Sequence, residues 1–436
     1  MKRRKFIKQS SFALAGLGMT SPAVRFIKGE KTEHRESDPT KEYLKNILYT
    51  KEEIVDWLSG NAFPFAKYSA EFGWLLNDAR FRDGIDDSYS TYTYGEYDER
   101  VMIHYRNKMC RINTYGDSFT QCHQVSDGET WQEILAAHLQ EPIRNFGVGG
   151  WSVYQAYLRM LKEEKRIPAK YIIFNIYDDD HLRNLDSWRN IRRRKHDRFI
   201  EPTLPYIKVN LKESSYSEHA NPCPTMESVY DLCDLNPTYD LFKDDFVLKI
   251  MRVHEYARRE NPLQAYEEMM QFASEHGINV TITDNDMLRK TAVQLHRSCA
   301  LFASKKIIEK IEKWALNNDK KVLYVLSFPA SSIKKYAQTA NRWDQSFVDF
   351  LKEKKLPYID LMQLHMDEFS NYKLSIKEYL KRYYIGHYNP FGNLFCAFAI
   401  KDKLVEMLNP KPVSYDPKPQ IFNDYPEKES YDHKDI

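Results

Sequence analysis

Short apolar runs alternate with longer segments in which apolar residues recur every three or four positions, beginning near residue 106. The short runs have the length of buried strands, and the longer segments have the period of helices that bury one face. This alternation predicts a parallel sheet flanked by helices, which is an α/β fold. The predicted strands are 110–115, a short strand ending at Asn145, 170–176, 321–326 and 356–360, and the predicted helices include 130–139, 152–165 and 394–407.

Other segments interrupt or flank this pattern. Residues 185–320 are mostly helical, at 246–258, 262–276 and 286–316, and we expect them to form an insertion that covers the active edge of the sheet. Before the pattern, a helix is predicted at 41–58 and tyrosine-rich strands and turns at 89–105. The predicted organisation is therefore a signal segment at 1–23, an N-terminal extension at 24–105, a core at 106–184 and 321–408, a helical insertion at 185–320 and a flexible tail at 409–436.

Charge and hydropathy narrow the class of protein. The 436 residues include 64 Lys and Arg against 62 Asp and Glu, which gives a net charge of +2. This balance argues against a nucleic-acid partner, because such proteins carry clustered positive charge. No apolar run has the length that a bilayer span requires, so we expect no stable membrane span.

The first residues predict export. Lys2-Arg3-Arg4-Lys5 precede a short, mildly apolar stretch and then small residues, which is the order of parts in a secretory signal. Arg3 to Lys8 resembles the twin-arginine motif, with Ile7 in place of Leu, so the export machinery is an expected partner. The chain is therefore expected to be periplasmic or extracellular. The alternative is an amphipathic N-terminal helix.

The six cysteines and the histidines show no metal-binding spacing, so no metal or organic cofactor is expected. Four other segments carry candidate chemistry. Gly116-Asp117-Ser118-Phe119 follows a predicted strand, where a serine would be exposed at the carboxyl edge of the sheet, although a plain surface turn has the same composition. The remaining three follow in chain order: Asn145-Phe-Gly-Val-Gly-Gly150, Tyr177-Asp178-Asp179-Asp180 and Gly386-His387-Tyr388-Asn389-Pro390-Phe391-Gly392.

These four segments, in this order, resemble the blocks of the SGNH/GDSL hydrolase family, which includes carbohydrate O-acetylesterases. The resemblance implies a flavodoxin-like three-layer α/β/α sandwich with a parallel sheet. It also implies that Ser118 is the nucleophile and His387 the general base, and that the Gly150 and Ser118 N–H groups form the oxyanion hole. Asp117, Asp180 and Asn389 occupy the places of supporting residues.

The chain departs from that family at two places. Asp179 stands where the family has an oxyanion-binding asparagine, and Tyr384 and Ile385 stand where it has the triad acid. Three interpretations stay open at this point. The serine and histidine work as a dyad; Asp179 or Asp180 approaches His387 and replaces the acid; or Asp179 is held protonated and donates to the oxyanion.

The resulting hypothesis is an exported serine hydrolase that cleaves an ester, with an O-acetyl group on a carbohydrate as the favoured substrate. The alternatives are a non-catalytic glycan-binding protein on the same scaffold and an O-acyltransferase. The basic run 189–198 is interpreted as a solvated face that could also contact an anionic glycan. Cys122 and His123 are expected to have packing roles beside the nucleophile.

Overall fold

The computed structural model describes residues 38–61, 65–194, 201–256 and 262–415. The predicted export signal and most of the predicted tail lie outside these residues. Five parallel strands form the central sheet in the order β11-β10-β7-β5-β6. In chain order this is 2-1-3-4-5, the flavodoxin-like arrangement, so the predicted α/β fold is confirmed. The strands are β5 (Ile112–Tyr115), β6 (Arg144–Asn145), β7 (Tyr171–Tyr177), β10 (Lys321–Ser327) and β11 (Tyr358–Asp360).

The two longest strands lie side by side in the middle of the sheet. Their register runs from Lys321 opposite Tyr171 to Ser327 opposite Tyr177. Almost every residue of both strands is buried. Helices cover both faces of a parallel sheet, and this explains why these strands appear in the sequence as continuous apolar runs rather than alternating ones.

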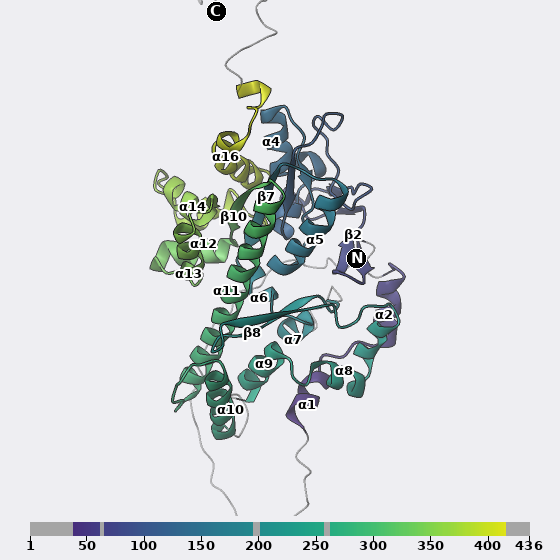
Figure 1. Ribbon diagram of the computed structural model, residues 1–436, viewed down its shortest axis with the longest axis vertical. Helices are drawn as coiled ribbons and strands as arrows, with labels where there is room; N and C mark the ends of the chain where they lie inside the picture. The colour runs from purple at the N-terminus through teal and green to yellow at the C-terminus, as the bar shows by residue number, and fades with distance from the viewer. Residues whose placement is uncertain (1–37, 62–64, 195–200, 257–261, 416–436) are drawn as a thin grey trace, which may run out of the picture. The chain divides into compact units, whose positions relative to one another are not determined.

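The helices form the two outer layers (Figure 1). One layer holds α4 (Trp131–Leu139), α14 (Leu361–Phe369) and α16 (Pro390–Met407), and the other holds α5 (Val153–Arg166) and α11 (Asn285–Asn317). Side chains that accept backbone N–H groups set where several helices begin, as Ser152 does for α5. The smaller helices after β10 and β11 are α12 (Ala330–Thr339), α13 (Gln345–Glu353) and α15 (Ile376–Lys381). None of the helices among the described residues combines the length and apolar character needed to cross a membrane.

The segment between β7 and β10 is largely helical, as predicted, and its last helix, α11, packs against β10 and α5. It also holds an antiparallel hairpin, β8 (Tyr206–Asn210) and β9 (Ser215–His219), which the sequence analysis did not predict. The strand Ser-Tyr-Ser-Glu-His has no buried residue and therefore no apolar alternation to reveal it. The helices of this segment are α6 (Asp180–Arg183), α7 (Arg189–Arg193), α8 (Leu235–Phe242), α9 (Phe246–Tyr256), α10 (Pro262–Glu275) and α11.

The residues before the core contain more short elements than predicted. The single helix expected at 41–58 is two helices, α1 (Pro39–Lys45) and α2 (Lys51–Leu58), because Thr50 and Glu53 form a capping box that starts a new helix. Two antiparallel strand pairs follow, β1 (Ala66–Ser69) with β2 (Gly73–Leu76) and β3 (Ala79–Phe81) with β4 (Ser90–Tyr92). Phe72, Trp74 and Leu76 pack with Val148, Trp151 and Leu204, so this region shares a small apolar cluster with the core.

Candidate active site

Ser118 lies at the carboxyl edge of the sheet, immediately after β5. Gly116 has φ +152°, and a Cβ there would lie 2.2 Å from Thr120 Oγ1 and 2.7 Å from the Asn175 carbonyl oxygen, so only glycine fits the turn. Asp117 Oδ1 accepts the Phe119 N–H at 2.9 Å and caps the short helix α3 (Ser118–Gln121). Ligands bind at this edge in open α/β sheets, where the strand order reverses between β5 and β7.

His387 faces Ser118 from the other end of the chain. Its Nε2 lies 2.9 Å from Ser118 Oγ, although the two residues are 269 positions apart. Gln124 Oε1 accepts the His387 backbone N–H at 2.7 Å and fixes the loop. Asn389 stabilises the same loop, because it caps α16 at the Gly392 N–H and donates to the Arg382 carbonyl oxygen. The structure therefore brings together Ser118, His387 and Asn389.

The second ring nitrogen of His387 has no carboxylate partner among the residues that the structure describes. The nearest titratable ring is that of His123, whose centroid lies 5.0 Å from that of His387. His123 Nε2 in turn lies 3.5 Å from Asp83 Oδ2. Burial lowers the pKa of His387 well below its usual value, and the neighbouring His123 and Arg183 lower it further. The imidazole is therefore neutral at pH 7 and able to accept a proton.

This lowered pKa predicts an unusual pH profile. A general base works only when it is unprotonated, so lowering its pKa extends activity toward acid. For a reaction in which His387 is the general base, we expect kcat/KM to stay level as the pH falls through 6.5, the ordinary pKa of histidine, and to decline only at lower pH. The measurement is kcat/KM between pH 4 and 9 with a substrate that does not ionise in this range. A midpoint of the kcat/KM profile at or above pH 6.5 would contradict the assignment of His387 as a general base without a carboxylate partner.

The glycine-rich loop lies beside Ser118. A Cβ added to Gly149 would lie 3.6 Å from Ser118 Cβ, so this backbone directly adjoins Ser118. Gly150 has φ +85°, a backbone conformation that strains residues with a side chain, and a Cβ there would also crowd Arg189 Nη1 at 2.4 Å. Neither the Gly150 N–H nor the Ser118 N–H has a hydrogen-bond partner among the described residues. Two unused donors beside a nucleophile can hold a developing oxyanion.

Asp179 does not face His387, and this corrects two of the three interpretations left open by the sequence. Its carboxylate binds Arg192 through two hydrogen bonds, at 2.7 and 3.0 Å, and Arg183 Nε at 3.0 Å. Burial alone would raise the pKa of Asp179, but Arg192 and Arg183 outweigh it and hold the pKa far below its usual value. An ionised carboxylate with these partners is neither a protonated donor nor a triad acid.

Arg183 is the centre of this aspartate cluster. Its Nη1 lies 2.7 Å from Asp180 Oδ1, 3.2 Å from Asp117 Oδ2 and 3.0 Å from the Trp151 carbonyl oxygen. Asp180 therefore also pairs with Arg183 and not with His387. Burial raises the pKa of both Asp117 and Asp180, and Arg183 opposes that shift. Ser118 Oγ donates to Asp117 Oδ2 at 3.1 Å, and Arg183 pairs with the same carboxylate, so Arg183 balances a charge next to Ser118.

The basic run is a solvated face only in part: Arg193 and Arg194 are exposed, whereas Arg189 is buried and Arg192 is half-buried, which corrects the expectation for these two. Arg189 is buried and donates to the Gly150 carbonyl oxygen at 2.6 Å. Arg192 binds Asp186 as well as Asp179. Residues 195–198 of the run lie outside the described residues. Arg189 and Arg192 therefore belong to the interior of the site, where Arg189 binds the Gly150 carbonyl oxygen and Arg192 binds Asp179 and Asp186.

Sequence reasoning missed several side chains that shape the site, namely Trp74, His123, Gln124 and Arg183. Cys122 has the expected packing role, since its thiol is buried against Gln132, but the His123 ring also lies against the ring of His387. Only His123 and Gln124 carry a signal in the sequence, because they follow closely after Ser118. Among the described residues there is no group of three or more His, Cys, Asp or Glu able to hold a metal ion.

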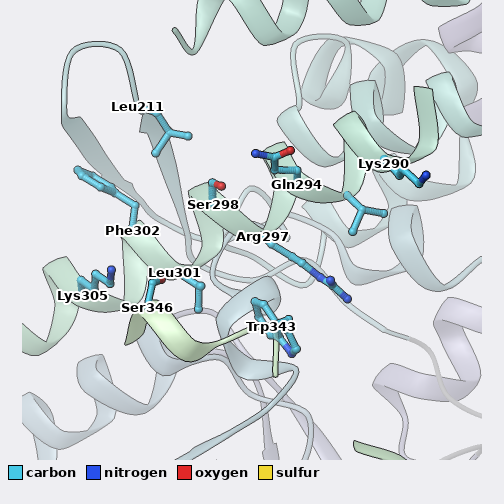
Figure 2. Close-up of a pocket in the computed structure, with 11 residues that line it drawn as sticks. Leu211, Lys290, Gln294, Arg297, Ser298, Leu301, Phe302, Lys305, Trp343 and Ser346 are labelled. Carbon is cyan, nitrogen blue, oxygen red and sulfur yellow. The ribbon is translucent and has the colours of Figure 1, made fainter. Parts of the chain in front are cut away.

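A pocket of about 590 Å³ lies along α11, and Figure 2 shows Arg297 and Trp343 side by side within it. The Arg297 guanidinium lies 5.2 Å from the centroid of the Trp343 ring. Lys290 and Lys305 add positive charge to the lining. A smaller pocket of about 220 Å³ also involves Arg297 and Trp343 and includes Asp179. The two pockets share Arg297 and Trp343 in their linings, and neither Ser118 nor His387 lines either of them.

Comparison with known proteins gives only distant likenesses. No protein-family model and no curated protein matches the chain. One similar solved structure is a "putative acylhydrolase" from Bacteroides fragilis, with 10% identity, a TM-score of 0.30, and 70% of this chain and 89% of that chain covered. Another is a "putative lipolytic protein of G-D-S-L family" from Desulfitobacterium hafniense, with 10% identity, a TM-score of 0.29, and 66% and 98% covered. The fold class rests on the strand order and the helix layers described above.

Proposed function

We propose that this protein is a serine esterase of the SGNH/GDSL type, with Ser118 as nucleophile and His387 as general base. The observation that carries the proposal is the 2.9 Å contact between Ser118 Oγ and His387 Nε2, beside the Gly150 and Ser118 N–H groups, which bind no other described residue. A nucleophile, a base and oxyanion donors at one sheet edge are the parts that acyl transfer requires.

In the proposed reaction, Ser118 Oγ attacks the ester carbonyl carbon while His387 Nε2 takes the hydroxyl proton. The Ser118 and Gly150 N–H groups donate to the oxygen as it becomes negative. The intermediate then expels the alcohol, which receives the proton from His387. Water then attacks the acyl-enzyme carbonyl carbon while His387 takes its proton. The acid is released, and Ser118 regains its proton from His387.

The substrate that we propose is an O-acyl group, most simply acetyl, on a carbohydrate. The α11 pocket, which Ser118 and His387 do not line, offers serine, glutamine, lysine and arginine side chains that can bind hydroxyl-rich or anionic sugars outside the proposed catalytic centre. The proposal of export rests on Arg3 and Arg4 in the N-terminal segment.

Mass spectrometry after treatment with a serine-directed fluorophosphonate tests the catalytic assignment. We expect one phosphonyl group on the peptide that contains Ser118, and no label in Ser118→Ala. Labelling should also fail after denaturation, because the reaction needs His387 and the oxyanion donors in place. An unlabelled Ser118 in folded protein would favour the rival proposal, a glycan-binding protein. The lack of a carboxylate on the second His387 nitrogen, within the part of the chain that the structure describes, also favours this rival. Acyl transfer to an added sugar would instead indicate an acyltransferase.

Export is tested separately. Replacing Arg3 and Arg4 with lysine should leave an uncleaved precursor inside the cell, because the receptor of the twin-arginine route reads both guanidinium groups. The measurement is immunoblotting of cytoplasmic and periplasmic fractions, with Lys2→Arg as a control that keeps the pair. Normal processing of the double-lysine variant would contradict the twin-arginine assignment.

A further inference from the structure

The peptide bond between Gly149 and Gly150 carries the N–H that the proposed function places in the oxyanion hole. The carbonyl oxygen of this peptide, on Gly149, accepts a hydrogen bond from Trp74 Nε1 at 3.1 Å. A trans peptide is planar, so its C=O and N–H point in opposite directions. The indole therefore fixes the direction of the Gly150 N–H from the opposite side of the peptide.

Trp74 is itself held rigidly. It lies on β2, is only 1% exposed, and packs in the cluster with Phe72, Val148 and Trp151. Its ring lies against the loop, since a Cβ added to Gly150 would be 3.2 Å from Trp74 Cζ2. Close packing of this kind leaves a large side chain one orientation, so the donor stays in place without reorganisation.

The other polar groups of the two glycines are also occupied. The Gly149 N–H donates to Gln121 Oε1 at 2.9 Å, and the Gly150 carbonyl oxygen accepts from Arg189 Nη1 at 2.6 Å. Among the described residues, only the Gly150 N–H of these four groups has no partner. Because three of the four polar groups of this backbone are held by hydrogen bonds, the Gly150 N–H points in a single direction.

We propose that Trp74 is a positioning residue of the oxyanion hole, contributed by the region before the hydrolase core. This inference rests on the proposed function, because it assigns a task within the same reaction. Preorganised donors stabilise the transition state because they need not reorient when charge develops. Trp74 touches neither substrate nor the reacting atoms and acts through the Gly149–Gly150 peptide.

Trp74→Phe tests the proposal, with Trp57→Phe as the matched control. Trp57 is equally buried and belongs to the same region, but its indole N–H has no partner in residues 38–61, 65–194, 201–256 and 262–415. For p-nitrophenyl acetate we expect Trp74→Phe to lower kcat about tenfold with little change in KM, which is the effect of one neutral hydrogen bond. Trp57→Phe should keep the wild-type kcat. Titration of active sites with the fluorophosphonate normalises each rate to active enzyme.

A second substrate separates positioning from a general structural effect. Sulfur accepts hydrogen bonds more weakly than oxygen, so cleavage of the matching thionoester depends less on the oxyanion hole. We expect the ratio of ester to thionoester rates to fall in Trp74→Phe and to stay constant in Trp57→Phe. A merely structural role would lower both rates together and leave the ratio unchanged.

An unchanged ratio in Trp74→Phe would overturn the proposal. If that variant does not fold, benzothienylalanine at position 74 preserves the ring shape and removes only the N–H. The ratio of ester to thionoester rates then tests the proposal in that variant. If the proposed function itself is wrong, wild-type protein will cleave neither p-nitrophenyl acetate nor the matching thionoester. In that case both the function and the role of Trp74 are refuted, whereas wild-type turnover with an unchanged ratio refutes the role of Trp74 alone.

Discussion

Replacing Ser118 with alanine is expected to lower turnover of p-nitrophenyl acetate by about four orders of magnitude or more. The hydroxyl oxygen that would form the acyl-enzyme is lost, and no other described serine contacts His387 Nε2. His387→Ala should cost nearly as much, because without the base the hydroxyl keeps its proton. The double variant should be no worse than either single one, since the two residues act as a unit.

The fold should survive these changes. Ser118 is a small residue at the start of α3, and alanine is compatible with that position. We expect the melting temperature to change little, and Ser370→Ala, at an exposed serine on the end of α14, to keep full activity. Wild-type turnover by Ser118→Ala would show that the nucleophile is elsewhere.

Replacing Arg183 with methionine is expected to lower the free energy of unfolding by about 3–5 kcal/mol at neutral pH. Methionine fills similar space but removes the positive charge that Asp117, Asp179 and Asp180 share. Asp117 and Asp180 are almost completely buried, so their charges would remain without compensation. Urea unfolding followed by circular dichroism measures the loss, and Arg194→Met, at a partly exposed ion pair, is the control.

The stability loss of Arg183→Met should depend on pH, and its direction follows from the pKa shifts of the aspartates. Burial already raises the pKa of Asp117 and Asp180, and removing Arg183 should raise both further. A carboxyl with a raised pKa binds more protons in the folded state than in the unfolded state, so stability falls as the pH rises. The deficit of Arg183→Met should therefore be largest near pH 8 and shrink toward pH 5. An equal deficit at both pH values would show that packing, and not charge, explains it.

The sequence predicted the sheet because β7 and β10 are buried on both faces and so consist of apolar runs. It placed Ser118 and His387 through local motifs, and the structure brings the two together across 269 positions. It could not predict the partners of Asp179, because a pattern of residues does not determine which of several arginines a carboxylate faces. Arg183 and Arg192 lie beside it only after α6 and α7 have folded.

The short elements before the core reach both sides of the reaction centre. Trp74 contacts the glycine-rich loop, while Tyr92 and Asp83 bind Gln124, which holds the His387 backbone. The region before the core therefore belongs to the structure of the candidate active site. In this chain the α/β sandwich is not a self-contained module that could be exchanged without residues 66–92. Changes that loosen residues 66–92 would reach the surroundings of Ser118 and His387 without altering any residue of the four motifs.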